Sequence, residues 1–283
     1  MRWQGERESE NVEDRRGRGS VPMKAGAMGG GALILVIIAM LFGLDPSKLL
    51  SGLGGGGTPA AAAGEERQLT PQEIELKKFV AVVLGSTEDV WNKVLNARGS
   101  SYREPTLTLF SGAVATACGT QSSQVGPFYC PGDQHVYLDT DFFITMKNRL
   151  GAPGDFAQAY VIAHEVGHHV QNLLGYSEKV HALHGRVSQE EYNRASVRLE
   201  LQADFLAGVW AHHAQKLRNI LEAGDIEEAM GAAAAVGDDK LQREATGTVR
   251  PETFTHGTSK QRMQAFDLGL RTGDIQRAAE FFQ

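Results

Sequence analysis

Two histidines four residues apart, with a glutamate directly after the first, have the spacing in this chain that best fits catalysis. They form His164-Glu165-Val166-Gly167-His168 within the run AYVIAHEVGHHVQNLLG. Residues i and i+4 lie on one face of a helix, so both imidazoles can reach one zinc ion. Glu165 lies about 100° further around the helix, which suits a general base beside the metal rather than a ligand. The pattern predicts a catalytic zinc site.

A catalytic zinc ion usually has three protein ligands and one open position. The metzincin pattern would supply the third ligand from a glycine at position 171 and a histidine at position 174. The chain has Gln171 and Leu174 there, which excludes that class. We therefore expect an acidic ligand on a later helix.

A long helix is predicted from a capping box at Ser188 to about residue 213. Glu200 and Asp204 lie on one face of this helix, among apolar residues where unpaired carboxylates are costly. We expect Glu200 to be the third zinc ligand. We expect Asp204 to orient His164 or His168 through its distal ring nitrogen.

The helix that carries the two histidines is predicted over about residues 155–173. Asp155 is its expected N-cap and Gln158 stands three residues later in the capping-box position. Gly175 is expected to end it. His169 points about 100° away from His168 and is expected to lie outside the metal site.

The sequence pattern of residues 70–283 as a whole predicts a helix-rich α+β domain. Thr70 begins a helix that Gly85 is expected to end, and a second helix is expected from Ser86 to about Gly99. Short strands are predicted at residues 106–110 and 135–138, with a loop at 111–134 between them.

Composition narrows the classes of protein further. The chain has 283 residues, 42% of them hydrophobic and 22% charged, which fits a globular protein. Its formal net charge of −6 argues against nucleic acid as a partner, because nucleic-acid binders usually carry a basic patch. Zinc is the cofactor that the motifs predict.

The N-terminal part predicts three further segments. Residues 1–24 mix both charges densely and predict a disordered, solvated tail. Residues 25–44 contain no charged side chain, and a helix of that length would be about 30 Å long, enough to cross a membrane. A signal peptide is the alternative, but the small residues 60–63 lie too far along for ordinary cleavage. Residues 45–69 predict a Gly/Ala-rich linker.

More basic residues precede the apolar stretch than follow it closely. The positive-inside rule then makes residues 1–24 cytoplasmic and places residues 70–283 on the periplasmic side of the cytoplasmic (inner) membrane, anchored by one transmembrane helix. Cys118 and Cys130 could be free thiols or one disulfide. This topology favours the disulfide, because the compartment is oxidising.

With HEVGHH at 164–169 and LELQAD at 199–204, the chain resembles the bacterial neutral zinc metallopeptidases, from MRWQGERESENVEDRRG to THGTSKQR. A single anchor is typical of that family. The catalytic half also resembles the broader Glu-zincins. The resemblance implies a zincin-like fold and peptidase activity, with His164, His168 and Glu200 as zinc ligands and Glu165 as the base.

We therefore expect a membrane-anchored zinc endopeptidase that cleaves envelope proteins or peptides with a metal-activated water. Zincin-like domains bind extended substrates along a sheet edge, and His135–Leu138 is the expected edge. One alternative is a non-enzymatic envelope scaffold or adaptor that retains a zinc site, which would have no use for Glu165. A metal-storage module is the other, against which the scatter of the histidines argues.

Peptide hydrolysis also needs a donor for the oxyanion that forms on the scissile carbonyl. The resemblance places a histidine with a following arginine near the C-terminus, and His256 and Arg262 match. We expect His256 to donate to the oxyanion and Arg262 to fix its loop or assist. Tyr160 and Tyr137 are alternative donors, and a surface histidine without a catalytic role is the remaining interpretation.

Overall fold

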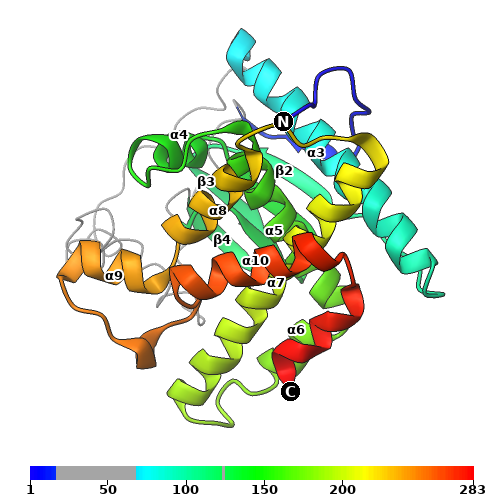
Figure 1. The fold of residues 1–283 in the computed structure, drawn as a ribbon. Helices are drawn as coiled ribbons and strands as arrows, with labels where there is room; N and C mark the ends of the chain where they lie inside the picture. Colours follow the sequence, from blue (N-terminus) through cyan, green and yellow to red (C-terminus); the bar gives the residue numbers. More distant parts are fainter. Residues whose placement is uncertain (17–67, 123–124) are drawn as a thin grey trace.

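The computed structural model describes residues 1–16, 68–122 and 125–283 (Figure 1), and their architecture is α+β and rich in helix, as predicted. The strands are β1 (Val12–Asp14), β2 (Thr106–Phe110), β3 (Ala113–Thr116), β4 (Gly119–Ser122), β5 (Phe128–Cys130) and β6 (His135–Asp139). The helices are α3 (Pro71–Asn96), α4 (Asp141–Asn148), α5 (Asp155–Leu173), α6 (Tyr176–His181), α7 (Gln189–Arg218), α8 (Asp225–Ala235), α9 (Asp238–Thr246) and α10 (Ser259–Thr272). Two 3₁₀ helices complete the description, η2 (Pro251–Thr253) and η3 (Ile275–Phe282).

The main sheet has the strand order β1-β2-β6-β5. β1 and β6 run parallel to β2, and β5 runs antiparallel to β6. The predicted strands at 106–110 and 135–138 are confirmed. The predicted loop at 111–134 is wrong in part, because it contains the hairpin β3–β4 and the strand β5. Its Gly and Ala residues give little β signal, and pairing with neighbouring strands makes it extended.

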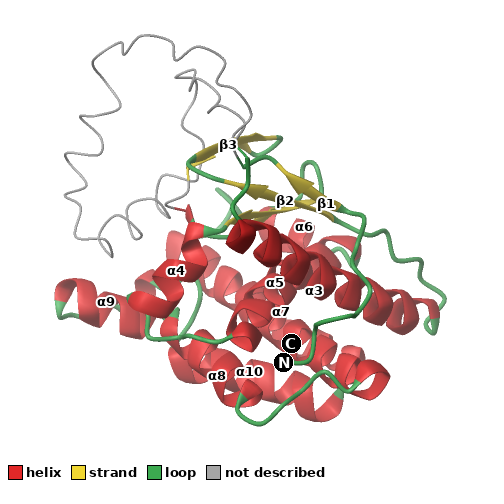
Figure 2. Cartoon of the chain, turned by 90° about the horizontal axis from the view of Figure 1, so that it is seen from above, coloured by secondary structure: helices red, strands yellow, loops and turns green. Residues whose placement is uncertain are grey.

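Helix α5 lies in the interior, between the sheet and the other helices. It contacts β5 and β6 on one side and α3, α7 and α8 on the others. Figure 2 shows the strands gathered on one side of the helical layer. The apolar residues of α5 are buried around most of its circumference, so neighbouring elements hold the helix on most sides. This fixes the two histidines of the motif in place.

The N-terminus of α5 is capped differently from the prediction. Gly154 is the N-cap and makes no side-chain capping bond, so Asp155 as N-cap and Gln158 in a capping box are wrong. The Glu228 carboxylate from α8 accepts the Phe156 N–H instead, at 3.0 Å. A side chain distant in the sequence thus satisfies an N–H that would otherwise lack a partner.

Helix α7 begins at the predicted capping box, in which Ser188 and Glu191 bond each other's backbone N–H. It crosses α10 at Gly208 and Gly269, where a Cβ on either residue would collide with the backbone of the other helix. Glycine therefore permits a close approach of the two helices. This approach brings the first turn of α10 against the middle of α7.

Helix α3 is continuous through Gly85, so the prediction of two helices, ending at Gly85 and restarting at Ser86, is wrong. Its capping box at Thr70 is confirmed. Glycine usually weakens a helix, but here it has a packing reason. A Cβ on Gly85 would lie 2.9 Å from the carbonyl oxygen of Arg7, so the glycine lets the N-terminal segment pack on the helix.

Residues 1–16 pack against the domain. β1 extends the main sheet beside β2. The buried Glu88 carboxylate of α3 accepts a hydrogen bond from the Ser9 hydroxyl at 2.5 Å and from the Asn11 amide at 2.8 Å. These contacts tie the segment to both the sheet and α3.

The prediction that residues 1–24 form a solvated tail apart from the domain is therefore wrong for residues 1–16. Dense mixed charge is typical of solvated segments, but here many of the charges have partners within the fold. The Arg7 guanidinium, for example, donates to the Glu88 carboxylate of α3 at 2.8 Å. The pairing of β1 with β2 places residues 12–14 and residues 106–110 in one sheet.

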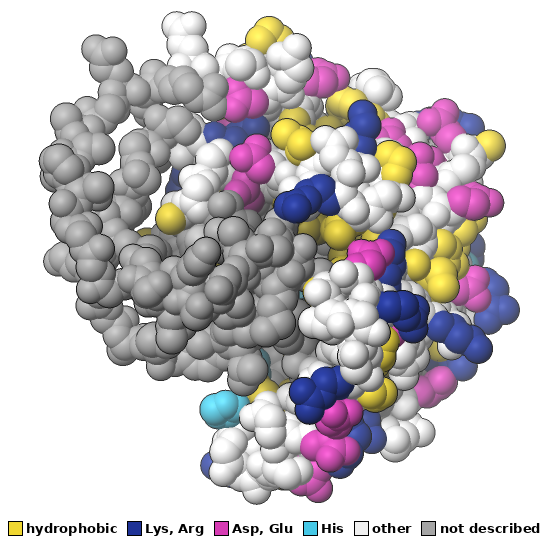
Figure 3. Space-filling model, turned by 90° about the vertical axis from the view of Figure 1, so that its left-hand side faces the viewer, with side chains coloured by type: hydrophobic (Ala, Val, Ile, Leu, Met, Phe, Trp, Pro, Cys, Tyr) yellow, Lys and Arg dark blue, Asp and Glu magenta, His cyan; other side chains and the backbone are white. Residues whose placement is uncertain are grey.

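The predicted transmembrane helix at 25–44 and most of the predicted linker at 45–69 lie outside the described residues. Among the residues that are described, no helix is both long and apolar enough to cross a membrane. On the surface in Figure 3, the visible basic and acidic side chains are interspersed.

Candidate metal centre

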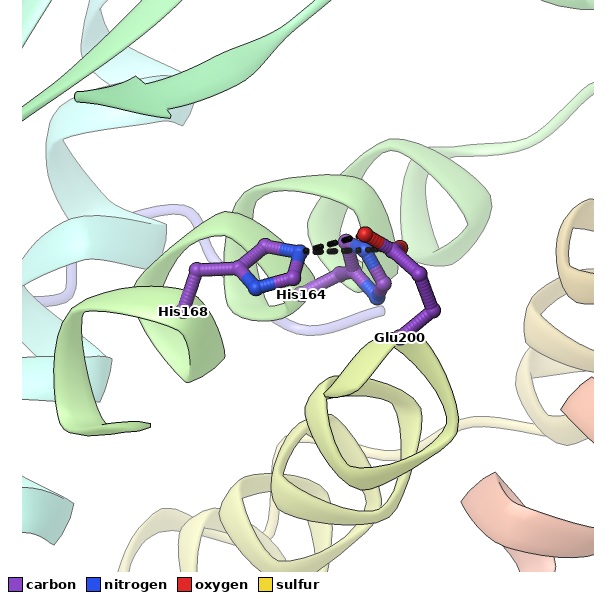
Figure 4. A group of neighbouring side chains, drawn as sticks. All are labelled: His164, His168 and Glu200. Carbon is purple, nitrogen blue, oxygen red and sulfur yellow. Dashed lines mark hydrogen bonds and ion pairs between the residues drawn. The ribbon is translucent and has the colours of Figure 1, made fainter. Parts of the chain in front are cut away.

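Three predicted ligands meet between α5 and α7. His164 and His168 extend from α5, and Glu200 extends from α7 toward both (Figure 4). The two Nε2 atoms are 3.2 Å apart. Oε2 of Glu200 lies 3.3 Å from Nε2 of His164, and Oε1 of Glu200 lies 3.5 Å from Nε2 of His168. The structure thus brings two imidazole nitrogens and the Glu200 carboxylate together, with one donor atom of each residue within 4.8 Å of the others.

The spacing of these atoms can be tested against the geometry of zinc. Bonds of about 2.0–2.2 Å in a tetrahedral arrangement separate neighbouring donor atoms by roughly 3.3–3.5 Å. The distance between the two Nε2 atoms lies just below this range, and the distance from each Nε2 atom to the Glu200 oxygen beside it lies within the range. Two histidines and one glutamate are also a ligand set of catalytic zinc sites, which leave a fourth position open. The residues therefore fit a zinc ion.

The second nitrogen of each imidazole is held by a side chain. Nδ1 of His164 lies 2.8 Å from the Asp204 carboxylate, and Nδ1 of His168 lies 2.8 Å from the amide oxygen of Gln171. Both acceptors place a proton on Nδ1, so Nε2 keeps its lone pair for a metal. The Gln171 amide donates to the carbonyl oxygen of Leu199 at 2.6 Å, which fixes it against α7.

Asp204 was predicted to orient one of the histidines, and the structure places it beside His164. Sequence reasoning did not identify Gln171 as the partner of His168. Its i+3 spacing from His168 puts it on the same face of α5, and that spacing is the signal that could have found it.

Asp204 is fully buried and has several partners. The Arg262 guanidinium donates to both carboxylate oxygens, at 2.7 and 2.9 Å, and the Tyr160 hydroxyl donates at 2.5 Å. Burial alone would raise the pKa of Asp204, but Arg262 and His164 lower it to about 2. Arg262 was expected to fix the loop of His256 or assist catalysis. In the structure it holds Asp204, and through it His164.

Glu165 lines the same cavity as the three ligands and is buried. Burial raises the pKa of its carboxyl group above the ordinary value, against the opposing effect of His164 and His168. A carboxylate with a raised pKa beside a metal site suits a general base. This is the position that the HExxH spacing predicted for it.

The cavity has a volume of about 1050 Å³. One wall contains the three ligands, and another contains Phe128 and Tyr129 of β5. The expected substrate edge at His135–Leu138 is wrong, because these residues belong to β6, which lies between β2 and β5. In the described part of the sheet, β5 is the outer strand on this side. Sequence reasoning missed β5 and therefore placed the edge one strand too far inward.

Tyr129 is attached to α5 by a residue next to the ligands. Its hydroxyl lies 3.0 Å from Nδ1 of His169, and Nε2 of His169 lies 2.6 Å from the carbonyl oxygen of Arg103. The carbonyl can only accept, so Nε2 carries the proton and Nδ1 accepts from Tyr129. His169 therefore joins β5 to the metal helix and lies outside the metal site, as expected.

His256 also lines the cavity. Burial would lower its pKa, but the carboxylates of Glu200 and Asp238 raise it. The two tyrosines considered as alternative oxyanion donors have other acceptors, because Tyr160 donates to Asp204 and Tyr137 donates to Asp133. His256 is the predicted donor that the described structure leaves facing the site.

The predicted disulfide is present. Cys118, between β3 and β4, is bonded to Cys130 at the end of β5. The bond attaches the hairpin to the outer strand of the main sheet, and no free cysteine is found in the described residues. It therefore restrains one end of the strand that lines the cavity.

The similarity of this chain to known proteins covers nearly its whole length, not only the residues of the site. A family described as "Putative neutral zinc metallopeptidase" matches residues 1–281. The protein YpfJ of Escherichia coli (strain K12) is 48% identical over 282 residues, covering 97% of this chain and 96% of its own length. The protein Rv2575 of Mycobacterium tuberculosis (strain H37Rv) is 42% identical over 252 residues, covering 83% and 82%. No solved structure matches the chain.

Proposed function

Because the chain belongs to the family described as "Putative neutral zinc metallopeptidase", we propose that it is a zinc-dependent endopeptidase whose ligands are His164, His168 and Glu200. The observation that carries the proposal is the position of Glu165. It is buried in the same cavity as three donor atoms that fit zinc. A purely structural zinc site needs no carboxylate base beside it.

The residues of the chain divide the work of hydrolysis. A bound zinc ion would polarise the scissile carbonyl and lower the pKa of a water molecule. Glu165 accepts the proton of the attacking water and later donates it to the leaving amine. Asp204 and Gln171 hold the two imidazoles in the orientation that directs Nε2 at the metal.

The substrate that this cavity suits is an extended peptide, which we place along β5. Strand addition supplies backbone hydrogen bonds without requiring a particular side chain. Two observations support β5: it is the outer strand of the described sheet on this side, and Phe128 and Tyr129 line the cavity. Its attachments to His169 and to the disulfide keep it in a fixed position relative to α5.

The test is cleavage of a mixed peptide library, with zinc stoichiometry measured on the same samples. Glu165→Gln should retain about one zinc ion and lose turnover by about 10²–10⁴-fold, the usual contribution of a general base. Glu178→Gln, an exposed glutamate on α6, is the matched control and should behave as wild type. A zinc-loaded wild type that cleaves nothing, or a Glu165→Gln variant as active as wild type, would contradict the proposal.

We also propose that the described domain lies outside the cytoplasm, with residues 1–16 on the same side as residues 68–283. The disulfide supports an oxidising compartment. The proposal also includes attachment of the protein to the membrane and cleavage of envelope proteins by its domain.

The location can be tested with two single cysteines on exposed residues, Glu8→Cys and Ser100→Cys. The native cysteines are bonded and should not react. A membrane-impermeant maleimide should label both new cysteines in intact spheroplasts. Labelling of Ser100→Cys alone would show that β1 does not pair with β2 in the cell, and labelling of neither would place the domain in the cytoplasm.

A further inference from the structure

The loop that carries His256 is held by one carboxylate. Asp238 is the first residue of α9, and its side chain is buried. Its Oδ2 atom accepts three consecutive backbone N–H groups, from Thr255 at 2.8 Å, His256 at 2.6 Å and Gly257 at 2.9 Å. The Asp238 N–H in turn donates to the carbonyl oxygen of Gly257 at 2.8 Å. One residue thus fixes the backbone on both sides of the histidine.

The other oxygen of the same carboxylate faces the histidine ring. Oδ1 of Asp238 lies 3.4 Å from Nδ1 of His256, and the Thr255 hydroxyl lies 3.0 Å from the same nitrogen. Nε2 of His256 has no hydrogen-bond partner among the described residues, and the side chain lines the cavity with the metal ligands. A carboxylate on one imidazole nitrogen fixes the ring and leaves the other nitrogen for substrate.

The loop also rests on the turn of α7 that presents Glu200. Gly257 has a φ of +91°, and a Cβ there would lie 3.2 Å from Val197 and 3.4 Å from Leu201. These two residues flank Glu200 along the helix. The glycine therefore lets the loop approach the ligand-bearing turn closely.

The next residue of α9 has a different contact. Asp239 accepts the Ser259 N–H at 2.7 Å and lies 3.2 Å from the Ser259 hydroxyl. No contact between Asp239 and His256 is found in the described structure. Two adjacent aspartates thus bind the same segment, and only Asp238 reaches the histidine.

We propose that Asp238 is the positioning residue for His256: one carboxylate oxygen sets the loop, and the other orients the ring so that Nε2 donates to the carbonyl oxygen of the peptide under attack. The inference rests on the proposed peptidase function. It assigns a function to a buried carboxylate that lies outside both sequence motifs, and it gives α9 a part in catalysis.

The experiment compares Asp238→Asn, His256→Ala, their double variant and the control Asp239→Asn in the zinc-loaded full chain. Asparagine keeps an oxygen for the three N–H groups and removes the charge that faces Nδ1. His256→Ala should lose about 10²–10³-fold in kcat, as for other oxyanion donors. Asp238→Asn should lose about 10–10²-fold in kcat with KM within a few-fold of wild type, and Asp239→Asn should retain wild-type kcat.

The double variant supplies the decisive comparison. If Asp238 acts through His256, Asp238→Asn should change kcat little in the His256→Ala background, because residues that act as a unit are not additive. Equal losses in both backgrounds, or an Asp238→Asn variant with wild-type kcat, would overturn the inference while Glu165→Gln still tests the peptidase itself. A wild type without cleavage activity would overturn both.

A second readout does not depend on turnover. In protein labelled with ¹⁵N-histidine, the Nδ1–H signal assigned through His256→Ala should be present in wild type and in Asp239→Asn. It should shift or disappear in Asp238→Asn, whose thermal unfolding should show that the domain is still folded. An unchanged signal in folded Asp238→Asn would overturn the inference.

Discussion

Helix α5 carries two clusters of ionisable groups, one at its first residue and one in its middle, and different partners neutralise them. At the first residue, the Asp155 carboxylate lies 2.7 Å from the Met1 ammonium group, which also contacts Asp225 at 3.2 Å. In the middle, the Glu200 carboxylate has only the two imidazoles of His164 and His168 as ion-pair partners in the described structure. The chain itself thus supplies a cation to the first cluster.

Both clusters place several donor atoms within 4.8 Å of one another, so distance alone does not separate them. The hydrogen bonds of the two clusters distinguish them. In the first cluster the carboxylates are bonded to the Met1 ammonium and, through Glu228, to the Phe156 N–H. In the second, hydrogen bonds hold the far side of each imidazole and leave the near nitrogens facing Glu200. The first cluster therefore holds the fold together, and the second is arranged for a ligand.

The largest expected effect separates the two clusters by metal binding. Glu200→Ala should lose nearly all bound zinc and activity, because two histidines remain where a catalytic site needs three ligands. Asp225→Asn, its counterpart in the first cluster, should retain about one zinc ion. Zinc content by metal analysis after dialysis measures both. Normal zinc in Glu200→Ala would place the third ligand elsewhere, and zinc loss in Asp225→Asn would remove the distinction.

A smaller effect concerns the buried partner of His164. Asp204→Asn should weaken zinc affinity by about 10–100-fold, the usual effect of losing a residue that orients a ligand. Tyr160→Phe is the control, because it removes one hydrogen bond to Asp204 and keeps the carboxylate. Competition with a chromogenic chelator measures both affinities. Equal affinity in Asp204→Asn and wild type would show that Asp204 serves only the packing of Arg262.

The Met1 ammonium of the first cluster belongs to residues 1–16. Whether this segment packs on α3 can be tested by the sign of a change in stability. In an ordinary helix Gly→Ala is stabilising by about 0.5–1 kcal/mol. If residues 1–16 pack on α3, a Cβ at Gly85 meets the Arg7 carbonyl oxygen at 2.9 Å, and Gly85→Ala should lower the free energy of unfolding by about 1–3 kcal/mol.

Urea unfolding measures the effect of Gly85→Ala, and zinc stoichiometry should stay unchanged. Glu75→Ala, an exposed change on the same helix, is the control and should have little effect. A stabilising Gly85→Ala would show that the N-terminal segment does not pack there.

The features of this molecule that could be predicted from the sequence are mainly those with local signals. The helices α5 and α7 were predictable because their signals are local: the HExxH spacing, the Ser188 capping box and the recurrence of apolar residues at helical spacing. The disulfide was predictable from the pair of cysteines and the expected compartment. For the two helices, the residues that carry the signal are near one another in the chain.

What sequence reasoning missed depends on contacts between distant residues. Residues 1–16 resemble a solvated tail until the partners of their charges on α3 are known. Gly85 resembles a helix end unless the segment that packs against it is known. Asp238 resembles an exposed helix start until the three N–H groups of the His256 loop are placed around it. No local pattern encodes these pairings, because each depends on the folded arrangement.

The smallest expected effect concerns His169, the neighbour of His168 on α5. His168 faces the metal site, whereas His169 joins α5 to Tyr129 of β5. Burial lowers the pKa of His169 from 6.5 to about 4, against the hydrogen bond to the Arg103 carbonyl oxygen. The unfolded chain would bind the proton at an ordinary pKa near 6.5. Between these values the unfolded state holds more protons, so the stability contributed by neutral His169 is present above about pH 6.5 and is lost as pH falls toward 4.

From pH 7 to pH 5.5, this group alone should lower the free energy of unfolding by roughly 1 kcal/mol. Urea unfolding of zinc-free wild type and His169→Gln at both pH values isolates the contribution, because the remaining groups titrate in both proteins. His184→Gln changes an exposed histidine and should keep the wild-type pH dependence. If His169→Gln kept it as well, His169 would not be the neutral link between Tyr129 and α5, and the position of β5 would need another explanation.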